Sequence, residues 1–356
     1  MKNRFKLLLC KLGCCHQYGI FSLNHTRSLS LIFYGSDEFS LLSLKSLVAH
    51  RDEKDLITKL EVVTKPRTLI DKFSKEISLR HHHWPYRLRS SEFDLGIVVS
   101  FGELIDKDSI QSCEHGMINV HPSLLPRWRG STPIPRAIMA GDEETGVTIV
   151  TIKPEKFDIG DVLMKASFPL SEHIKTKELV NKLGNLGANL LIECIENLQH
   201  HLQNAQPQGK KGSCYAKKLK VEDAFVDWRL LSAIEVDRKF RALDGILPLF
   251  TKWINSESLR LYEMINFQES SSLNWSRAEL LINGQIVNQP GLCMYNKRLG
   301  ALCIKCSDQN WVAFKTLGLK NHRRMSALDF NNGFLSKAKN RKLVILPHFN
   351  NKNNCS

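Results

Sequence analysis

Three nearly all-apolar segments in the first third of the chain limit its fold more than any other feature. They are Leu29–Gly35, Leu60–Thr64 and Asp94–Phe101. Strands that are apolar on both faces are typical of the centre of a parallel sheet. Because a helix is expected between the first two, over Phe39–His50, the pattern predicts an α/β fold with a Rossmann-like, doubly wound, mostly parallel sheet. Gly35 stands without the further glycines of a dinucleotide-binding motif, so a nicotinamide cofactor is not expected.

Helix signals complete the expected sheet-and-helix unit. Ser36 or Asp37 can cap the first helix, and Thr132 is expected to cap a short one that Gly141 ends. A returning strand is predicted over Val162–Pro169. Apolar residues then follow at spacings of three and four, which predicts one long amphipathic helix that lies on the sheet. These residues are Leu179, Leu183, Leu186, Leu190, Cys194, Leu198 and Leu202.

Polar side chains suited to acyl transfer lie at the carboxyl end of a further short strand, Met117–His121. Successive side chains of a strand point to opposite faces, so Asn119 and His121 share one face. Downstream of a strand over Gly146–Ile152, a turn that Gly160 closes delivers Asp158. An amide can donate to a developing oxyanion, an imidazole can move protons, and a carboxylate can orient the imidazole. These three residues are therefore candidate catalytic groups, unless the first two merely satisfy a buried strand end.

Three motifs in this region together resemble a known family. They are NVHPSLLPRWRG (Asn119–Gly130), GDEETGVTI (Gly141–Ile149) and FDIGD (Phe157–Asp161). The set is similar to the formyl-transfer domain of enzymes that use 10-formyltetrahydrofolate, and the PRWRG form resembles the methionyl-tRNA formyltransferase branch. The resemblance extends over residues 30–335.

The resemblance implies transfer of a formyl group from 10-formyltetrahydrofolate to the α-amine of methionyl initiator tRNA, for mitochondrial translation initiation. Asn119 would then hydrogen-bond the formyl oxygen. His121 would help to hold the oxyanion and relay a proton to the departing folate nitrogen. Asp158 would orient His121, directly or through a water molecule, and accept charge from the amine.

The resemblance also implies two sets of binding residues. The expected folate-binding residues are Phe101, Gly102, Ser123, Leu124, Leu125 and Pro126. The expected tRNA-binding residues are Lys65, Arg67, Arg127, Arg129, Lys217 and Lys218. Arg127 and Arg129 can contact tRNA or brace their own loop, and the sequence leaves both open. Family members usually carry a Gly- and Arg-rich loop after the second strand. The loop is short here, so the resemblance is weaker for tRNA discrimination than for the chemical step.

Charge is distributed unevenly along the chain. Residues 1–36 carry a net charge of +5, residues 37–205 carry −3 and residues 206–356 carry +12, within a total of +14. A near-neutral catalytic unit joined to a basic one suits a substrate attached to a polyanion. Short β-rich pieces between turns predict a small antiparallel barrel of the OB type after a helix over Arg238–Leu247.

Two alternatives to the implied function remain. One is a formyltransferase acting on a small amine, such as glycinamide ribonucleotide, and the other is a non-catalytic RNA-binding protein that kept the fold.

The expected domain organisation has five parts. They are a transit peptide (1–28), the catalytic domain (29–203), a linker (204–222), the basic OB-like tRNA-binding domain (223–335) and a basic disordered tail (336–356). The first part has basic residues without Asp or Glu, which is typical of mitochondrial targeting, whereas a secretory signal would need an apolar core unbroken at Lys11. The expected protein is a monomer of the mitochondrial matrix with no membrane segment.

Cysteine and histidine patterns do not predict a metal. Cys303 and Cys306 form a single C-x-x-C without a second pair, so they are expected to be buried thiols, and the ten cysteines suggest no disulfide framework. A run of three histidines, His81–His83, is expected to be a solvated loop, because adjacent residues on one backbone rarely converge on one ion. We therefore expect no metal cofactor.

Overall fold

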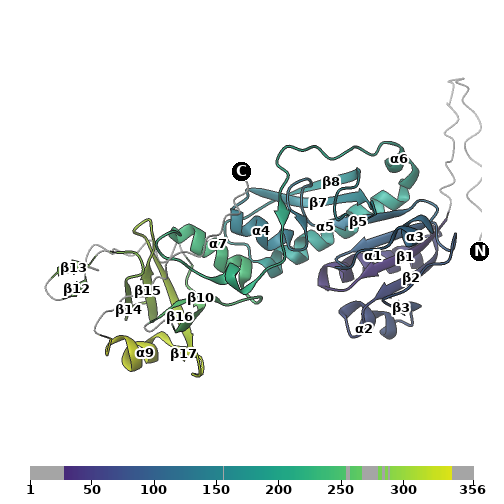
Figure 1. Ribbon diagram of the computed structural model, residues 1–356. Helices are drawn as coiled ribbons and strands as arrows, with labels where there is room; N and C mark the ends of the chain where they lie inside the picture. Colours follow the sequence, from purple (N-terminus) through teal and green to yellow (C-terminus); the bar gives the residue numbers. More distant parts are fainter. Residues whose placement is uncertain are drawn as a thin grey trace, which may run out of the picture.

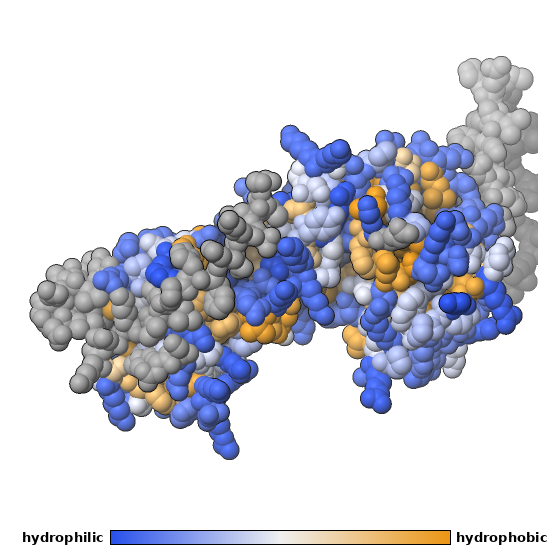
Figure 2. Space-filling view, in the orientation of Figure 1, coloured by the Kyte–Doolittle hydropathy of each residue, from blue (hydrophilic) through white to orange (hydrophobic). Residues whose placement is uncertain are grey.

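The computed structural model describes residues 28–154, 156–253, 257–266, 280–282, 285–287 and 289–338. The predicted transit peptide and nearly all of the predicted tail lie outside these residues. Two sheet-containing units follow one another along an elongated molecule (Figure 1). Apolar side chains gather on the face of the N-terminal unit shown in Figure 2, within a mostly hydrophilic surface. None of the described helices is both long and apolar enough to span a bilayer.

The N-terminal unit is built on a seven-stranded sheet with the order β3-β2-β1-β4-β5-β7-β8. Its strands are β1 (Leu29–Gly35), β2 (Ile57–Thr64), β3 (His81–His83), β4 (Leu95–Val99), β5 (Met117–His121), β7 (Glu144–Thr151) and β8 (Val162–Pro169). Strands β1 to β5 pair in parallel, while β7 pairs antiparallel with both β5 and β8. This mixed sheet confirms the predicted Rossmann-like architecture. The carboxyl ends of β1, β4 and β5 consequently meet at one edge, where such sheets bind ligands.

Six helices among the described residues pack around this sheet. They are α1 (Glu38–Glu53), α2 (Leu69–Glu76), α3 (Lys107–Gln111), α4 (Pro133–Ala140), α5 (Thr176–Glu196) and α6 (Leu198–Gln203). Helix α1 follows the predicted cap Asp37, whose carboxylate accepts a hydrogen bond from the Ser40 amide at 3.0 Å. Asp37 is thus fixed at the carboxyl edge of β1, close to the region where ligands bind.

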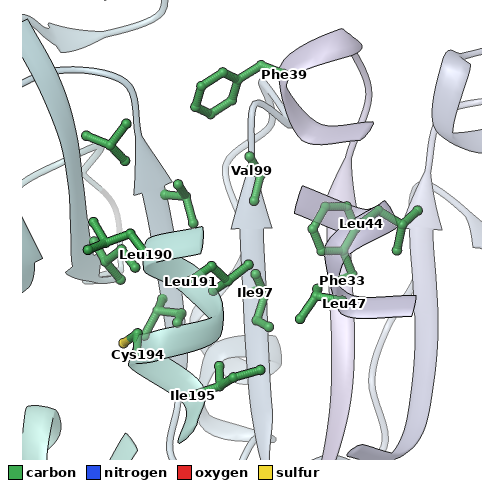
Figure 3. Packing of buried hydrophobic residues seen from close by; sticks show 14 of the residues in the cluster. Phe33, Phe39, Leu44, Leu47, Ile97, Val99, Leu190, Leu191, Cys194 and Ile195 are labelled. Carbon is green, nitrogen blue, oxygen red and sulfur yellow. The ribbon is translucent and has the colours of Figure 1, made fainter. Parts of the chain in front are cut away.

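Helices α1 and α5 pack together on one face of the sheet (Figure 3). Leu191 of α5 lies beside Ile97 of β4, and Leu47 of α1 is also fully buried. Each such side chain contributes roughly 1.5–3 kcal/mol by leaving water. The apolar stripe predicted for the long helix therefore holds the sheet from one side and leaves its carboxyl edge free for polar groups.

Three local predictions in this unit need correction. The long helix is broken at Asn197, whose φ of −123° and ψ of 33° are not helical, although Leu198 keeps the apolar stripe in the core. His81–His83 forms the edge strand β3 instead of a loop, because its backbone pairs with β2. Thr132 precedes α4, but its hydroxyl donates to the Lys217 carbonyl at 2.8 Å and does not cap the helix. Gly141 ends α4 with a φ of 72°, as predicted.

The C-terminal unit contains an antiparallel sheet with the order β10-β11-β16-β15-β14, and β17 pairs with β16. Its strands are β10 (Leu249–Lys252), β11 (Ser258–Met264), β14 (Cys293–Asn296), β15 (Ala301–Lys305), β16 (Trp311–Leu319) and β17 (Met325–Ser326), with β12 (Leu280–Ile282) and β13 (Gln285–Val287) as a separate pair. Among the described residues, no pairing joins β10 to β14, so the sheet is not closed into a barrel there.

Short helices complete this C-terminal unit. They are η1 (Val221–Ala224), α7 (Ala233–Leu243), α9 (Ala327–Phe330) and η4 (Asn331–Leu335). Helix α7 begins five residues before the predicted start, because Ser232 and Glu235 form a capping box that the sequence analysis did not use. Trp228 is fully buried beside it and donates its indole hydrogen to Thr251 at 2.9 Å.

The segment predicted as a linker, residues 204–222, lies against the catalytic unit. Strand β9 (Tyr215–Ala216) pairs in parallel with β6 (Arg129–Gly130), and Gln206 bridges to Val162. Near its end, the Asp223 carboxylate accepts two hydrogen bonds from Arg136 of α4, at 2.9 and 3.0 Å. The connection between the two units is therefore built into the carboxyl edge of the first sheet.

Candidate active site

The structure brings the three predicted catalytic side chains together. The Asn119 Nδ2 donates to Asp158 Oδ1 at 2.8 Å, and His121 Nδ1 lies 3.4 Å from the same oxygen. Asn119 and His121 come from the end of β5, and Asp158 comes from the turn between β7 and β8. Strand β7 pairs with β5, which brings this turn to the end of β5. The predicted shared face of the strand therefore converges on one carboxylate.

The second nitrogen of His121 fixes the protonation chemistry of the ring. Nε2 lies 2.8 Å from the Trp128 carbonyl oxygen, and a carbonyl can only accept, so Nε2 carries a hydrogen. Protons consequently enter and leave the ring at Nδ1, the nitrogen that faces Asp158. The His121 and Asp158 side chains are 5% and 7% exposed, so water competes little for this contact.

The turn that carries Asp158 is held by its backbone as well as its carboxylate. Asp158 has a φ of 56°, a conformation that Asp tolerates better than most residues. Gly130 N donates to Asp158 Oδ2 at 2.8 Å, so both oxygens have donors. A Cβ on Gly160 would lie 1.5 Å from the Thr151 carbonyl oxygen, which explains why the FDIGD motif needs glycine there.

Gln208 is a site residue that the sequence analysis missed. Its Nε2 donates to the Asp158 carbonyl at 2.9 Å and to the Gly160 carbonyl at 2.7 Å. Its Oε1 accepts from Arg129 at 2.7 and 3.0 Å. Gln208 thus ties the Asp158 turn to the loop that follows β5. It lies in a polar segment without periodicity, and no signal in the sequence marks it.

A cavity of about 1010 Å³ opens directly above these groups. Asn119, His121 and Asp158 all line it. Its apolar walls come from the strand ends and the loops around them, and these residues include Val98, Phe101, Leu104, Ile105, Ile152 and Phe157. Phe157 is 52% exposed and Leu104 is 46% exposed, so the rim offers apolar surface to a ligand. This volume and lining suit a large, flat organic molecule.

The six expected folate-binding residues take two different positions. Phe101 and Gly102 line the cavity, and Gly102 has a φ of 77° with open space where a Cβ would lie. Ser123–Pro126 is not among the lining residues that the structure describes. Ser123 and Leu125 are instead fully buried, and Thr148 of β7 donates to the Ser123 carbonyl at 2.7 Å. This segment supports the site from below.

The two arginines after this segment are engaged within the protein. Arg127 forms two hydrogen bonds with Asp142, at 2.5 and 2.8 Å, and its guanidinium stacks over the Trp128 ring at 4.6 Å. The Trp128 indole donates to the same carboxylate at 2.7 Å. Arg129 is held by Gln208. These contacts favour the bracing role over direct tRNA contact, and they fix the Trp128 carbonyl that His121 requires.

Of the other four expected tRNA-binding residues, two line the cavity and two do not. Lys217 and Lys218, directly after β9, are exposed and line it. Lys65 forms an ion pair with Glu103, another lining residue. Arg67 is exposed in the turn after β2, with a φ of 65°. Positive side chains are therefore available at the mouth, while the floor carries Asp158.

The six cysteines among the described residues are buried, which agrees with the expected buried thiols at Cys303 and Cys306. Burial raises the pKa of Cys303 to about 12, and it raises the pKa of Cys306 still further. A thiol that burial keeps protonated is a poor nucleophile at neutral pH. In the part of the chain that the structure describes, one group has metal-ligand geometry, formed by Asp71, His81 and His83, and it does not line the cavity.

Comparison with known proteins identifies the family of the chain. The Formyl transferase family matches residues 45–195, and the formyl transferase C-terminal domain matches residues 218–335. The chain therefore belongs to the formyl transferase family. Within it, the chain is similar to the mitochondrial methionyl-tRNA formyltransferases of Homo sapiens and Mus musculus, with 34% and 36% identity over 312 residues. These matches cover 86% of this chain and 77% or 78% of the relatives.

Solved structures support the fold. HypX from Aquifex aeolicus in complex with tetrahydrofolic acid has a TM-score of 0.54 and 18% identity, and the match covers 87% of this chain and 48% of that one. At this identity the likeness concerns architecture, and it extends through both sheet-containing units.

Proposed function

We propose that this protein transfers a formyl group from 10-formyltetrahydrofolate to the α-amine of methionyl initiator tRNA. The observation that carries the proposal is the Asn119, His121 and Asp158 cluster at the floor of a cavity of about 1010 Å³, bordered by exposed lysines. Membership of the formyl transferase family and the names of the mitochondrial relatives support the reaction and the tRNA substrate.

Asn119 supplies the hydrogen bond to the formyl oxygen. Its amide nitrogen has two hydrogens, and one of them is directed to Asp158 Oδ1. That contact orients the amide, so the second hydrogen points toward a fixed position in the cavity. A donor held in this way stabilises charge as it develops, because it need not reorganise during the reaction.

His121 and Asp158 manage the protons. A free α-amine titrates near about 8, and esterification lowers this value, so neutral amine is present at working pH. The chain therefore has to position the amine and accept its proton. Asp158 offers the negative charge beside the amine, and His121 exchanges a proton at Nδ1, since Nε2 is held by Trp128. The proton passes finally to the folate nitrogen that leaves.

The apolar part of the cavity is the expected position of the pterin ring of 10-formyltetrahydrofolate. Phe101 and Gly102 form the wall at the end of β4, where the exposed backbone can meet the edges of a flat ring. We assign Ser123–Pro126 to supporting the adjacent wall, because Ser123 and Leu125 are fully buried and the Leu125 amide donates to Thr148 of β7 at 3.1 Å. Bound folate supplies the formyl group, and the chain supplies position and charge.

The tRNA acceptor end is proposed to enter past the connecting segment. Lys217 and Lys218 lie at the cavity, and residues 206–356 carry a net charge of +12. We propose that residues 223–335 form an OB-like tRNA-binding domain, that Lys65 and Arg67 contact the acceptor stem, and that Arg127 and Arg129 hold the active-site loop. The mitochondrial relatives support a location in the mitochondrion. We further propose that the protein is a monomer of the matrix and that residues 1–28 are cleaved.

Replacing Lys217 and Lys218 together by alanine is expected to weaken tRNA binding through lost phosphate contacts. The slope of log affinity against log salt concentration should fall by up to about 2, since each phosphate contact contributes about 1. Titration of charged tRNA at several salt concentrations measures this slope. Lys210 and Lys211 are exposed in the same segment but do not line the cavity, so their double alanine variant is the matched control. An unchanged slope in the first variant would remove these lysines from the interface.

A formylation assay with purified protein tests the whole proposal. With 10-formyltetrahydrofolate as donor, initiator methionyl-tRNA is expected to be formylated faster than elongator methionyl-tRNA. Formylation of glycinamide ribonucleotide with neither tRNA modified would favour the small-amine alternative. Binding of tRNA without any transfer would favour a non-catalytic RNA-binding protein.

A further inference from the structure

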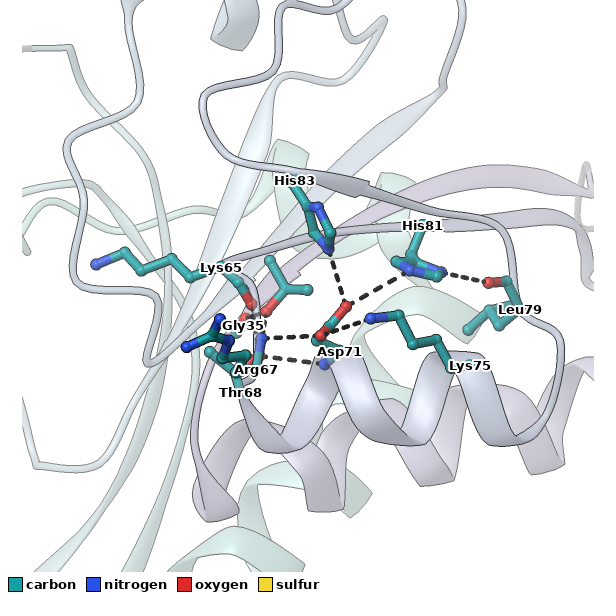
Figure 4. A network of polar contacts seen from close by, with 10 residues as sticks. Gly35, Lys65, Arg67, Thr68, Asp71, Lys75, Leu79, His81 and His83 are labelled. Carbon is teal, nitrogen blue, oxygen red and sulfur yellow. Dashed lines mark hydrogen bonds and ion pairs between the residues drawn. The ribbon is translucent and has the colours of Figure 1, made fainter.

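Two histidines of the edge strand β3 face a buried carboxylate, away from the cavity. Because side chains alternate along a strand, His81 and His83 share one face, while His82 points to the other and contacts Glu61 at 2.7 Å. The shared face meets Asp71 of α2, whose side chain is 3% exposed (Figure 4). One ligand atom each from Asp71, His81 and His83 lie within 4.8 Å of one another.

The two oxygens of Asp71 have different surroundings. Oδ2 accepts from Lys75 Nζ at 2.9 Å and from the Arg67 amide at 2.8 Å. Oδ1 lies 2.9 Å from His83 Nε2 and 3.5 Å from His81 Nε2. Protein donors thus occupy one oxygen, and the other faces imidazole nitrogens.

The outer contact of His81 fixes which of its nitrogens can bind a cation. Nδ1 lies 3.1 Å from the Leu79 carbonyl, which can only accept, so Nδ1 carries the hydrogen. In the neutral ring, Nε2 then presents its lone pair toward Asp71 Oδ1. Two acceptors face each other at 3.5 Å, and a cation between them relieves the repulsion. Histidine ligands of metals usually donate their other ring hydrogen to a carbonyl or carboxylate in this way.

We propose that Asp71, His81 and His83 bind one divalent transition-metal ion of the Zn²⁺ class. Two imidazole nitrogens and one carboxylate oxygen are a ligand set that Zn²⁺ accepts, with a fourth position for water. His83 is 46% exposed, so solvent can fill that position and the ion can enter. Metal–ligand bonds of about 2.0–2.2 Å in a tetrahedral site place the ligand atoms about 3.3–3.6 Å apart. The distance from Asp71 Oδ1 to His81 Nε2 is already 3.5 Å, whereas Oδ1 and His83 Nε2, at 2.9 Å, have to move apart slightly, which rotation of the half-exposed His83 side chain allows.

The site is separate from the formyl-transfer chemistry and holds structure. Asp71 joins α2 to the turn after β2 through the Arg67 amide, and Thr68 in that turn caps α2 by accepting the Asp71 amide at 3.1 Å. A bound ion would connect β3, α2 and this turn in one network. Because it binds the folded state, it raises the unfolding temperature by an amount that grows with the logarithm of the ion concentration divided by the dissociation constant.

Titration of the tag-free full-length protein with ZnCl₂ tests the proposal, read by calorimetry and by thermal unfolding. Co²⁺ provides a second probe, since a tetrahedral site gives visible absorption. The His83→Ala variant is expected to lose one equivalent of bound metal, with at least about tenfold weaker affinity, and to lose the Zn²⁺-dependent rise in unfolding temperature. His83 is half exposed, so this variant should fold, and His81→Ala should behave in the same way.

The matched control is His82→Gln, which removes a histidine of the same tripeptide from the opposite face. It should bind metal like the unmodified protein. Metal binding that is equal in the unmodified protein and in His83→Ala would overturn the proposal, as would an unmodified protein that binds no Zn²⁺. Loss of the ion in His82→Gln with retention in His83→Ala would also overturn it, because the ligands would then be different. These experiments measure metal binding and not formyl transfer, so the metal-site proposal and the proposed formyl-transfer function can each fail independently of the other.

Discussion

Replacing Asp158 by asparagine is expected to lower kcat by about 10²- to 10⁴-fold while the protein stays folded. Asparagine has the same shape and tolerates the φ of 56° at this position, so the turn should persist. The change removes the negative charge beside His121 Nδ1, and a single amide oxygen cannot serve both Asn119 and the Gly130 amide. Single-turnover formylation measures the chemical step, and thermal unfolding verifies the fold.

Asp161 offers a matched control three residues further along the same turn. Its carboxylate pairs with Lys153 at 3.0 Å, is 34% exposed and does not line the cavity. The Asp161→Asn variant should therefore retain kcat within about twofold, since exposed ion pairs contribute little. A folded Asp158→Asn enzyme with turnover equal to that of Asp161→Asn would remove Asp158 from the active site.

Replacing His121 by alanine is expected to reduce kcat by about 10²- to 10⁴-fold as well, because proton transfer loses its carrier. KM for the folate donor should change less than kcat, since the imidazole contacts Trp128 and Asp158 at the floor of the site and not its apolar wall. Because His121 is buried, asparagine at this position is a second variant in case alanine destabilises the fold.

The control for this change is His115→Ala. His115 lies just before β5 and contacts Gln199 at 3.1 Å near the surface, outside the cavity lining. It should keep normal turnover. If the two His121 variants are folded and as active as His115→Ala, then proton transfer does not pass through this imidazole, and Asp158 must act by itself.

The active site also depends on the segment that connects the two units. Gln208 holds the Asp158 turn, and β9 pairs with β6 immediately beside the Gly130 amide that Asp158 accepts. The basic C-terminal unit is therefore attached through residues that position the catalytic carboxylate. This arrangement gives a physical route by which tRNA engagement and catalytic geometry can influence each other.

Local patterns in the sequence determined much of this protein. Alternation along β5 placed Asn119 and His121 on one face, apolar character predicted β1 and β4, and Gly141 marked the end of α4. The FDIGD motif identified Asp158. These features depend on the periodicity of side chains, on backbone sterics and on a few neighbouring residues, all of which can be read from the sequence.

Contacts between distant segments were decided only by the tertiary structure. Gln208 reaches Asp158 across 50 positions. Arg127 pairs with Asp142, which favours the bracing role that the sequence had left open beside tRNA contact. The histidine run became an edge strand because β2 offered backbone partners, and Asp71 reached it from α2. Such pairings depend on where packing brings surfaces together, and a polar side chain without periodicity carries no local signal of the partner it will meet.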